Sequence, residues 1–226
     1  MSRRPVNRRL HGAIVMAAGA GTRIGHRPKC LLERDGVSLI ERLIRLLAAA
    51  GLPSGVVVLG HHAPRILPLL QKIRADAACP MDLRWAINSR PDDGPGSSLR
   101  TGLRALPPGK GNGVMVALAD QPLIEACDIE WLIKAWHARG PNVSLLVPQH
   151  QGTPGHPLIL DRWVMQDTLR AAGGEGVREW RQRHPERVQR VTVDHPRYTL
   201  DIDTEDERQA LAGASGICLD WPADLR

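Results

Sequence analysis

Short apolar runs alternate with longer amphipathic segments through the first half of the chain. The run and segment pairs lie at residues 13–17 and 38–50, 56–59 and 64–75, and 83–87 and 97–106. Strands that alternate with helices in this way predict βαβ units and a parallel sheet. A fourth run, residues 113–119, is apolar at successive positions, which is typical of a central strand buried on both faces.

Capping signals locate the ends of several helices. Ser38 is a candidate N-cap with Glu41 three residues later, and Gly51 follows the same helix. Thr204 and Glu207 form a second candidate capping box. The remaining elements that the pattern predicts are helices at 129–139 and 205–212 and a strand at 143–147. We therefore expect an α/β fold, a single Rossmann-like three-layer domain with a mostly parallel sheet.

The start of the chain differs from the rest. Residues 1–11 contain four arginines but no apolar core of the kind that a secretory signal has, so we expect a basic disordered tail. The remaining residues, 12–226, fit one domain with its own core. No apolar stretch approaches the roughly 20 residues of a membrane-spanning helix. We expect no membrane association.

Cysteine usage and charge narrow the setting and the partners. The cysteines are scattered and form no CxxC pair, which argues against a zinc site or a disulfide scaffold and fits a reducing, cytoplasmic location; they are Cys30, Cys79, Cys127 and Cys218. A formal net charge of +6 suggests an anionic partner. The basic residues are dispersed and only 3% of residues are aromatic, so we do not expect nucleic acid to be that partner.

A glycine-rich loop follows the first predicted strand. Its sequence, residues 17–25, is Ala-Ala-Gly-Ala-Gly-Thr-Arg-Ile-Gly. Glycines let backbone N–H groups approach an anion closely, and Arg23 and Lys29 add two cations, so phosphate is the natural ligand. An ordinary glycine-rich turn with a solvated pair of charges is the alternative interpretation.

Two common phosphate-binding motifs do not fit this loop. A Walker loop is excluded because no Gly-Lys-Ser/Thr closes the motif. A dinucleotide fingerprint is weakened because the second strand ends in Leu59-Gly60-His61-His62, without the acid that would bind a ribose. An NAD(P)-binding oxidoreductase stays a minority hypothesis, which requires nicotinamide affinity and no metal.

Three acids are candidate metal ligands. Asp120 directly follows the buried run 113–119, and ligands bind at the carboxyl ends of strands in open α/β sheets. Asp201 and Asp203 lie two residues apart, so in an extended chain they face the same side. Mg²⁺ takes one or two carboxylates together with substrate phosphates. The alternatives are a helix cap or surface turn for Asp120, and helix-start acids for the other two.

The loop, extended through Pro28-Lys29, resembles the signature of the MobA-like nucleotidyltransferase family, particularly the molybdenum cofactor cytidylyltransferases. Further matching stretches occur in the same order, at residues 96–103 (Gly-Ser-Ser-Leu-Arg-Thr-Gly-Leu), 118–123 (Leu-Ala-Asp-Gln-Pro-Leu), 155–157 (Gly-His-Pro) and 201–206 (Asp-Ile-Asp-Thr-Glu-Asp). The resemblance covers residues 12–211. It implies a fold of the nucleotide-diphospho-sugar transferase type.

The resemblance also implies roles for individual residues. The nucleotide-binding residues would be Ala17, Ala18, Gly19, Gly21, Thr22, Arg23, Lys29, Gly96 and Ser98. Ser98 would contact the ribose or base, although Ser97 or Ser98 could simply cap the following helix. His156 would line the acceptor side of the cleft. The catalytic residues would be Lys29, Arg23 and Asp120, with Mg²⁺ held by Asp120 and by Asp201 or Asp203.

The implied reaction is in-line attack by an acceptor phosphate on the α-phosphorus of a nucleoside triphosphate, with release of pyrophosphate. An Ala17-Ala18-Gly19 opening resembles the CTP-using branch of the family, and a side chain at position 18 would narrow the room for a purine. The implied acceptor is molybdopterin that carries molybdenum, with a molybdoenzyme or its chaperone as a possible protein partner.

Other activities fit the same motifs. The loop and the acids indicate binding of a nucleoside triphosphate but do not identify the acceptor. A sugar phosphate or an alcohol phosphate is therefore an alternative acceptor. A non-catalytic cofactor-binding accessory protein for a molybdoenzyme is an alternative of another class. Lys29 and Asp120 argue against it, because a carrier would need neither.

Overall fold

The computed structural model describes residues 9–109 and 111–226. Most of the expected tail therefore lies outside the described residues. Strand β1 (Leu10–Ala17) begins two residues before the expected start of the domain. The main sheet has the strand order β10-β7-β9-β6-β1-β4-β5, with β8 paired to β7. Its other strands are β4 (Ser54–Leu59), β5 (Asp82–Ile87), β6 (Gly113–Leu118), β7 (Leu145–His150), β8 (Thr153–Pro154), β9 (Leu158–Asp161) and β10 (Val188–Val193).

The sheet is mixed but mostly parallel, as predicted. Strands β1, β4, β5 and β6 run parallel to one another, and β10 runs parallel to β7. Strand β9 pairs antiparallel with both β6 and β7. Every residue of β4 is buried, as expected for a central strand whose two faces are covered.

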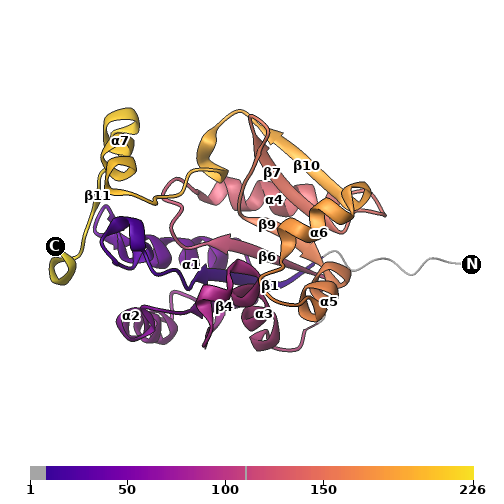
Figure 1. Cartoon of the computed structure of the whole chain (residues 1–226), viewed down its shortest axis with the longest axis horizontal. Coiled ribbons are helices and arrows are strands. Elements are labelled where there is room, and N and C mark those ends of the chain that lie inside the picture. Colours follow the sequence, from indigo (N-terminus) through magenta and orange to yellow (C-terminus); the bar gives the residue numbers. More distant parts are fainter. Residues whose placement is uncertain (1–8, 110) are drawn as a thin grey trace, which may run out of the picture.

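Two helical layers cover the sheet (Figure 1). One large apolar cluster joins the sheet to α1 (Leu39–Ala49), α2 (Ala63–Ala75) and α4 (Ala126–Ala138). A second cluster joins it to α3 (Pro95–Ala105), α5 (Arg162–Arg170) and α6 (Val177–Arg183). The three-layer α/β prediction is therefore confirmed.

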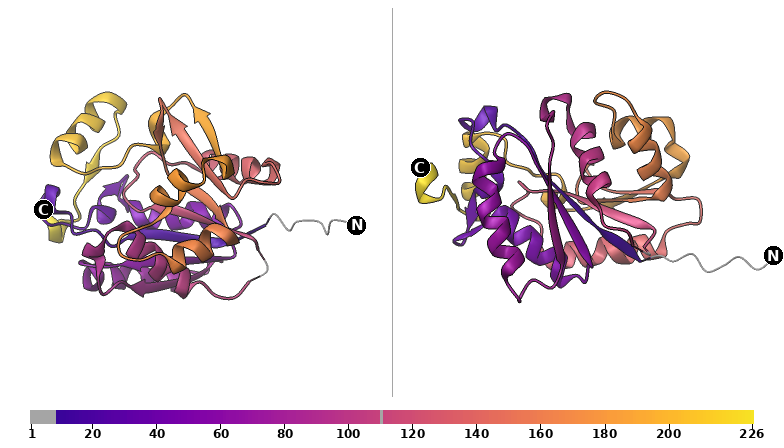
Figure 2. Two further views of the ribbon diagram at one scale, coloured as in Figure 1. Left: turned by 45° about the vertical axis from the view of Figure 1, so that its right-hand side comes forward. Right: turned by 90° about the horizontal axis from the view of Figure 1, so that it is seen from below.

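A smaller sheet joins two distant parts of the chain. Strand β11 (Leu219–Asp220) pairs with β2 (Glu33–Arg34), which pairs with β3 (Val37–Ser38). Helix α7 (Glu205–Ser215) packs here through a third apolar cluster that includes Leu211 and Trp221. Figure 2 shows this C-terminal segment, in yellow, beside the indigo segment that follows β1.

Most predicted helix ends are confirmed to within a residue, and three are wrong, among them the end of α7, which lies at Ser215 and not at 212. The Ser38 hydroxyl accepts a hydrogen bond from the Glu41 N–H at 3.3 Å. Helix α4 begins at Ala126, three residues early, because the side chains of Glu125 and Asp128 form a capping box. Helix α3 begins at Pro95 after Gly94, so Ser97 and Ser98 lie inside its first turn and do not cap it.

The predicted strand at 143–147 is displaced, because a turn from Gly140 to Val143 delays its start until Leu145.

No helix in the described residues is long and apolar enough to cross a membrane.

Candidate functional site

The loop after β1 is a tight turn that requires glycine. Gly21 has φ 64°, and its carbonyl accepts hydrogen bonds from the N–H groups of Ile24 and His26 at 3.0 and 2.9 Å. A Cβ at Gly21 would lie 2.0 Å from the carbonyl oxygen of Arg27. The loop continues through the short 3₁₀ turns Thr22–Ile24 and Lys29–Leu31.

The far end of the chain anchors this loop through Arg27. The Arg27 side chain donates to the carbonyl oxygens of Ile24, at 3.1 Å, and Leu225, at 3.3 Å. Its guanidinium carbon lies 4.2 Å from the ring centroid of Trp221, a distance typical of a cation–π contact. Sequence analysis missed this anchor, because its partners are separated by nearly the whole chain.

The three candidate metal ligands come together. Asp120, Asp201 and Asp203 each offer a carboxylate oxygen, and these oxygens lie within 4.8 Å of one another. Asp120 follows β6 at its carboxyl end, and its carbonyl oxygen accepts a hydrogen bond from the Ile202 N–H at 3.3 Å. That bond holds the segment of Asp201 and Asp203 against the end of the sheet.

Lys29 contacts two of these acids. Its Nζ lies 2.6 Å from Asp120 Oδ2 and 2.7 Å from Asp203 Oδ1, and Arg23 also pairs with Asp203. The structure thus brings together all the residues predicted to be catalytic or metal-binding. The lysine is compatible with a metal at this site, because its flexible side chain lets the ammonium group move when another cation neutralises the acids.

The pKa values of the cluster reflect this crowding. Burial raises the pKa of Asp201, and the charges of Asp120 and Asp203 raise it further. Burial also acts to raise the pKa of Asp203, but the hydrogen bond and charge of Lys29, with the charge of Arg23, lower it overall. For Lys29 burial acts to lower the pKa, and the charge of Asp120 leads the contributions that raise it overall.

The donor set suits a hard divalent cation. Such ions take carboxylate oxygens together with oxygen ligands from substrate phosphates and water. The part-buried carboxylates of Asp120, Asp201 and Asp203 provide one such oxygen each within a single small volume. These side chains would hold the ion, which would supply charge neutralisation.

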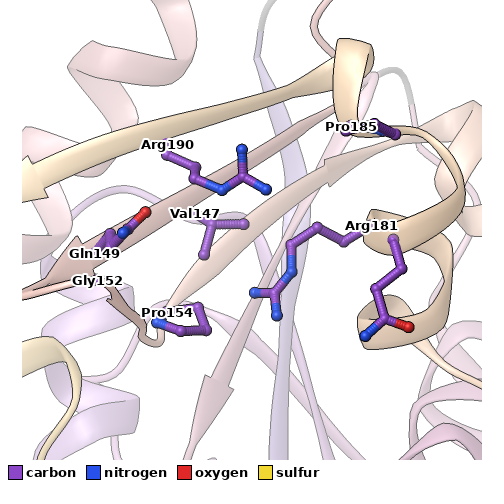
Figure 3. Close-up of a pocket in the computed structure, with 8 residues that line it drawn as sticks. Val147, Gln149, Gly152, Pro154, Arg181, Pro185 and Arg190 are labelled. Carbon is purple, nitrogen blue, oxygen red and sulfur yellow. The ribbon is translucent and has the colours of Figure 1, made fainter.

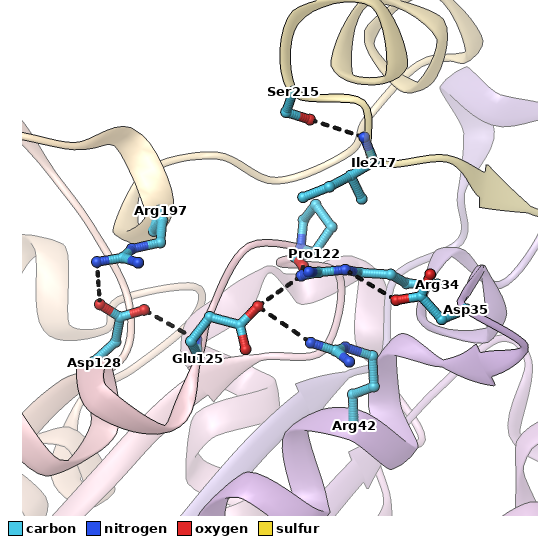
Figure 4. Close-up of polar contacts among 9 residues, drawn as sticks. All are labelled: Arg34, Asp35, Arg42, Pro122, Glu125, Asp128, Arg197, Ser215 and Ile217. Carbon is cyan, nitrogen blue, oxygen red and sulfur yellow. Dashed lines mark hydrogen bonds and ion pairs between the residues drawn. The ribbon is translucent and has the colours of Figure 1, made fainter.

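A network of arginines and acids supports the segment that carries Asp120 (Figure 4). Arg34 donates to the carbonyl oxygen of Pro122 at 3.0 Å and to Glu125 Oε1 at 2.8 Å. Glu125 also pairs with Arg42, at 3.4 Å. These contacts connect the segment after β6 to β2 and α1, so the position of Asp120 depends on both ends of the network.

Two cavities near the cluster share one lining residue, Met16. The larger, of about 440 Å³, is hereafter the site cavity; its lining includes Met16, Gly96, Leu118 and His156. The smaller, of about 90 Å³, is lined by residues that include Gly19, Lys29 and Asp120, with Met16 common to both. Of the candidate residues, Gly96 and His156 therefore line the site cavity, whereas Gly19, Lys29 and Asp120 line the smaller one.

The two predicted nucleoside contacts differ in position. Gly96 lines the site cavity, and a Cβ there would lie 2.1 Å from the carbonyl oxygen of Glu175. Ser98 is only 4% exposed, and its hydroxyl accepts a hydrogen bond from Asn88 Nδ2 at 3.0 Å. The hydrogen bond between Asn88 and Ser98 thus holds α3 against the end of β5. Sequence analysis did not identify Asn88.

Ala18 does not act as its sequence position suggested. The residue is 8% exposed and packs in the core with Val58 and Leu99. Ala18 is also not among the described residues that line the two cavities. The physical reason given above for excluding a purine is therefore wrong, because the side chain points into the core.

His62, to which sequence analysis assigned no chemistry, helps to form the loop. Its Nε2 lies 2.9 Å from the carbonyl oxygen of Ala20, and its side chain lines the smaller cavity. The neighbouring His61 pairs with Asp92 at 2.8 Å, on the exposed surface.

His156 should make stability depend on acid pH. Shielding from solvent and the charge of Arg181 lower its pKa from 6.5 to about 4. The folded chain resists protonation of His156. The contribution of the neutral histidine to the free energy of unfolding is therefore complete above pH 6.5 and is lost as pH falls toward 4. Urea unfolding at both ends of this range should show that His156→Gln loses less stability than wild type, by up to about 3 kcal/mol. Equal losses of stability in His156→Gln and wild type would show that His156 does not cause the pH dependence.

Comparison with known proteins defines the class. Residues 13–188 match the MobA-like NTP transferase domain family, so the chain belongs to that family. The resemblance seen in the sequence is confirmed at this level.

Individual relatives extend this comparison. The bifunctional protein GlmU of Mycobacterium avium is 33% identical over 173 residues, which are 75% of this chain and 35% of that protein. The chain thus spans about a third of the length of these curated relatives. Rv0371c from Mycobacterium tuberculosis H37Rv has 25% identity and a TM-score of 0.70, covering 91% of this chain and 100% of that one. A structure of Rv0371c in complex with manganese has 26% identity and a TM-score of 0.66, covering 90% and 98%.

Proposed function

We propose that this protein is a cytidylyltransferase that transfers CMP from CTP to the phosphate of molybdenum-loaded molybdopterin and releases pyrophosphate. The observation that carries the proposal is the contact of Lys29 with Asp120 and Asp203 beside the glycine loop. Such a group of a lysine and acids suits the binding of a metal–triphosphate complex. A protein that only carried a cofactor would need neither the lysine nor the acids.

Each residue has a role in this reaction. The loop from Ala17 to Thr22 binds the phosphates of the nucleotide, and Arg23 and Lys29 stabilise charge on them. Asp120, with Asp201 or Asp203, would hold Mg²⁺, which would supply neutralisation of the phosphate charge. Lys29, whose ammonium pairs with Asp120 and Asp203, would contact the phosphate oxygens.

No covalent enzyme intermediate is needed. The acceptor phosphate attacks the α-phosphorus in line, and pyrophosphate leaves on the opposite side. The protein contributes by orienting the two phosphates and by stabilising charge. Gly96 then faces the nucleoside and His156 the acceptor, with Ser98 acting indirectly through the position of α3.

The choice of CTP and of molybdopterin rests on the family resemblance. The Ala17-Ala18-Gly19 opening is similar to that of the CTP-using branch. A manganese complex of Rv0371c supports a divalent ion for this fold. A molybdoenzyme or its chaperone would then receive the product.

Pyrophosphate release tests the proposal. The purified protein is assayed with Mg²⁺ and CTP, GTP or ATP, each with molybdenum-loaded molybdopterin, a sugar 1-phosphate or an alcohol phosphate. We expect release with CTP and the molybdopterin acceptor only. Release with GTP would refute CTP as the specific nucleotide substrate. Release with another acceptor would refute molybdopterin as the specific acceptor. No release in any combination would contradict nucleotidyl transfer to these acceptor classes.

A further inference from the structure

A third cavity, hereafter the arginine cavity, opens beside the site cavity. It has a volume of about 340 Å³, and its lining includes Gln149, Pro154, Arg181 and Arg190. Figure 3 shows the side chains of Arg181 and Arg190 reaching into it over Val147. Arg181 comes from α6 and Arg190 from β10, so two separate elements place their guanidinium groups in one small volume.

These guanidinium groups lack carboxylate partners. Among residues 9–109 and 111–226, neither Arg181 nor Arg190 forms an ion pair within 4.0 Å. Glu179 is the acid that acts on Arg181, but its Oε2 accepts a hydrogen bond from the Gly176 N–H at 2.8 Å. Partial burial lowers the pKa of Arg181, and the charges of Arg190 and Arg178 lower it further. Charges of one sign that crowd together in this way favour a bound anion.

The cavities form a series. The arginine cavity shares Pro154 and Arg181 with the site cavity, and the site cavity shares Met16 with the small cavity of Lys29 and Asp120. The reacting phosphates belong at the Lys29 end. A nucleotide carries its negative charge on those phosphates, and its base is neutral, so it offers no anion to the other end of the series.

We propose that Arg181 and Arg190 form an anion subsite, which binds an anionic oxygen-bearing group of the acceptor separate from the phosphate that reacts. On molybdenum-loaded molybdopterin, which has one phosphate and no carboxylate, that group would be the oxygens bound to molybdenum. Two forked guanidinium groups suit the oxygens of such an anion, for which inorganic phosphate is a tetrahedral probe and acetate a planar one. The assignment to an acceptor rests on the proposed function, whereas anion binding by the two arginines does not.

Calorimetric titration of the full chain with inorganic phosphate, and separately with acetate, tests the subsite in EDTA without nucleotide. We expect phosphate to bind wild type and Arg104→Gln equally, because Arg104 is exposed on α3 and lines none of these cavities. Arg190→Gln should raise the Kd about tenfold. Arg190→Lys, which keeps the charge but not the fork, should give a smaller rise. Tighter binding of acetate than of phosphate would assign the subsite to a carboxylate and would exclude molybdopterin as its occupant.

Lys29→Gln separates this subsite from the glycine loop. We expect it to retain phosphate binding. The subsite is refuted if wild type binds neither anion, or if Lys29→Gln loses binding that Arg190→Gln keeps. Thermal unfolding of each variant checks that it is folded.

A kinetic measurement tests the acceptor assignment. In the transfer assay, Arg190→Gln should raise the KM for the acceptor several-fold with little change in kcat. An unchanged KM would overturn the assignment to the acceptor. Absence of transfer in wild type, together with phosphate binding that depends on Arg190, would refute the proposed function and leave the anion subsite standing.

Discussion

Asp120→Asn should lower kcat for nucleotidyl transfer roughly a thousandfold while leaving the fold intact. Metal-assisted charge stabilisation contributes several kcal/mol to a transition state, and each 1.36 kcal/mol is a factor of ten in rate. The asparagine keeps the size of the side chain but loses its charge. Because the side chain is partly exposed at the end of β6, the core should not change. Pyrophosphate release at saturating CTP and acceptor measures the effect.

Asp206→Asn is the matched control for this variant. Asp206 lies near the cluster in sequence, in the first turn of α7, but is exposed and not part of the group of three acids. It should retain the wild-type rate. A rate for Asp120→Asn within a few-fold of wild type would remove Asp120 from the catalytic site.

Lys29→Met should make stability depend on a divalent ion. Without the lysine, Asp120, Asp201 and Asp203 remain close together and Arg23 contacts only one of them. We expect a loss of about 2 kcal/mol in EDTA, reduced from the value for fully buried pairs because these side chains are partly exposed. Saturating Mg²⁺ should restore about as much, since an ion at a hundred times its Kd stabilises by about 2.7 kcal/mol.

Urea unfolding with EDTA and with Mg²⁺ provides this comparison. Lys134→Met serves as the control, because Lys134 is exposed on α4, away from the acids. Equal stability of Lys29→Met and wild type in EDTA would show that the lysine does not offset the acids. A loss that Mg²⁺ fails to reverse would argue against a metal site at these residues.

The sequence predicted the parts of the site that depend on local order. Asp120 follows a run of successive apolar residues, and a strand buried on both faces delivers its next residue to the carboxyl edge of the sheet. The glycine pattern likewise indicated a loop with room for close backbone approach, and in the structure Gly21 has φ 64° there. The preference of Mg²⁺ for carboxylates and the resemblance to a family grouped Asp120 with Asp201 and Asp203, but their approach depends on tertiary structure and had no local signal.

Other features had no local signal. The antiparallel strand β9 between β6 and β7 is a short apolar run like its parallel neighbours, so periodicity could not give its direction. Asn88 and Ser98 meet because β5 and α3 pack together. Ala18 was placed correctly in the loop, but the direction of its methyl group depends on the core that forms around it.

The contact of Arg27 with Trp221 and Leu225 has a consequence for synthesis of the protein. Arg27 emerges from the ribosome early, but Leu225 follows 198 residues later. Until that segment has emerged, the loop of residues 17–29 lacks its anchor even if the sheet beneath it has already formed. A nascent chain would therefore form the sheet beneath the loop before it acquires an ordered loop, and any nucleotide binding by the loop should follow the synthesis of Leu225.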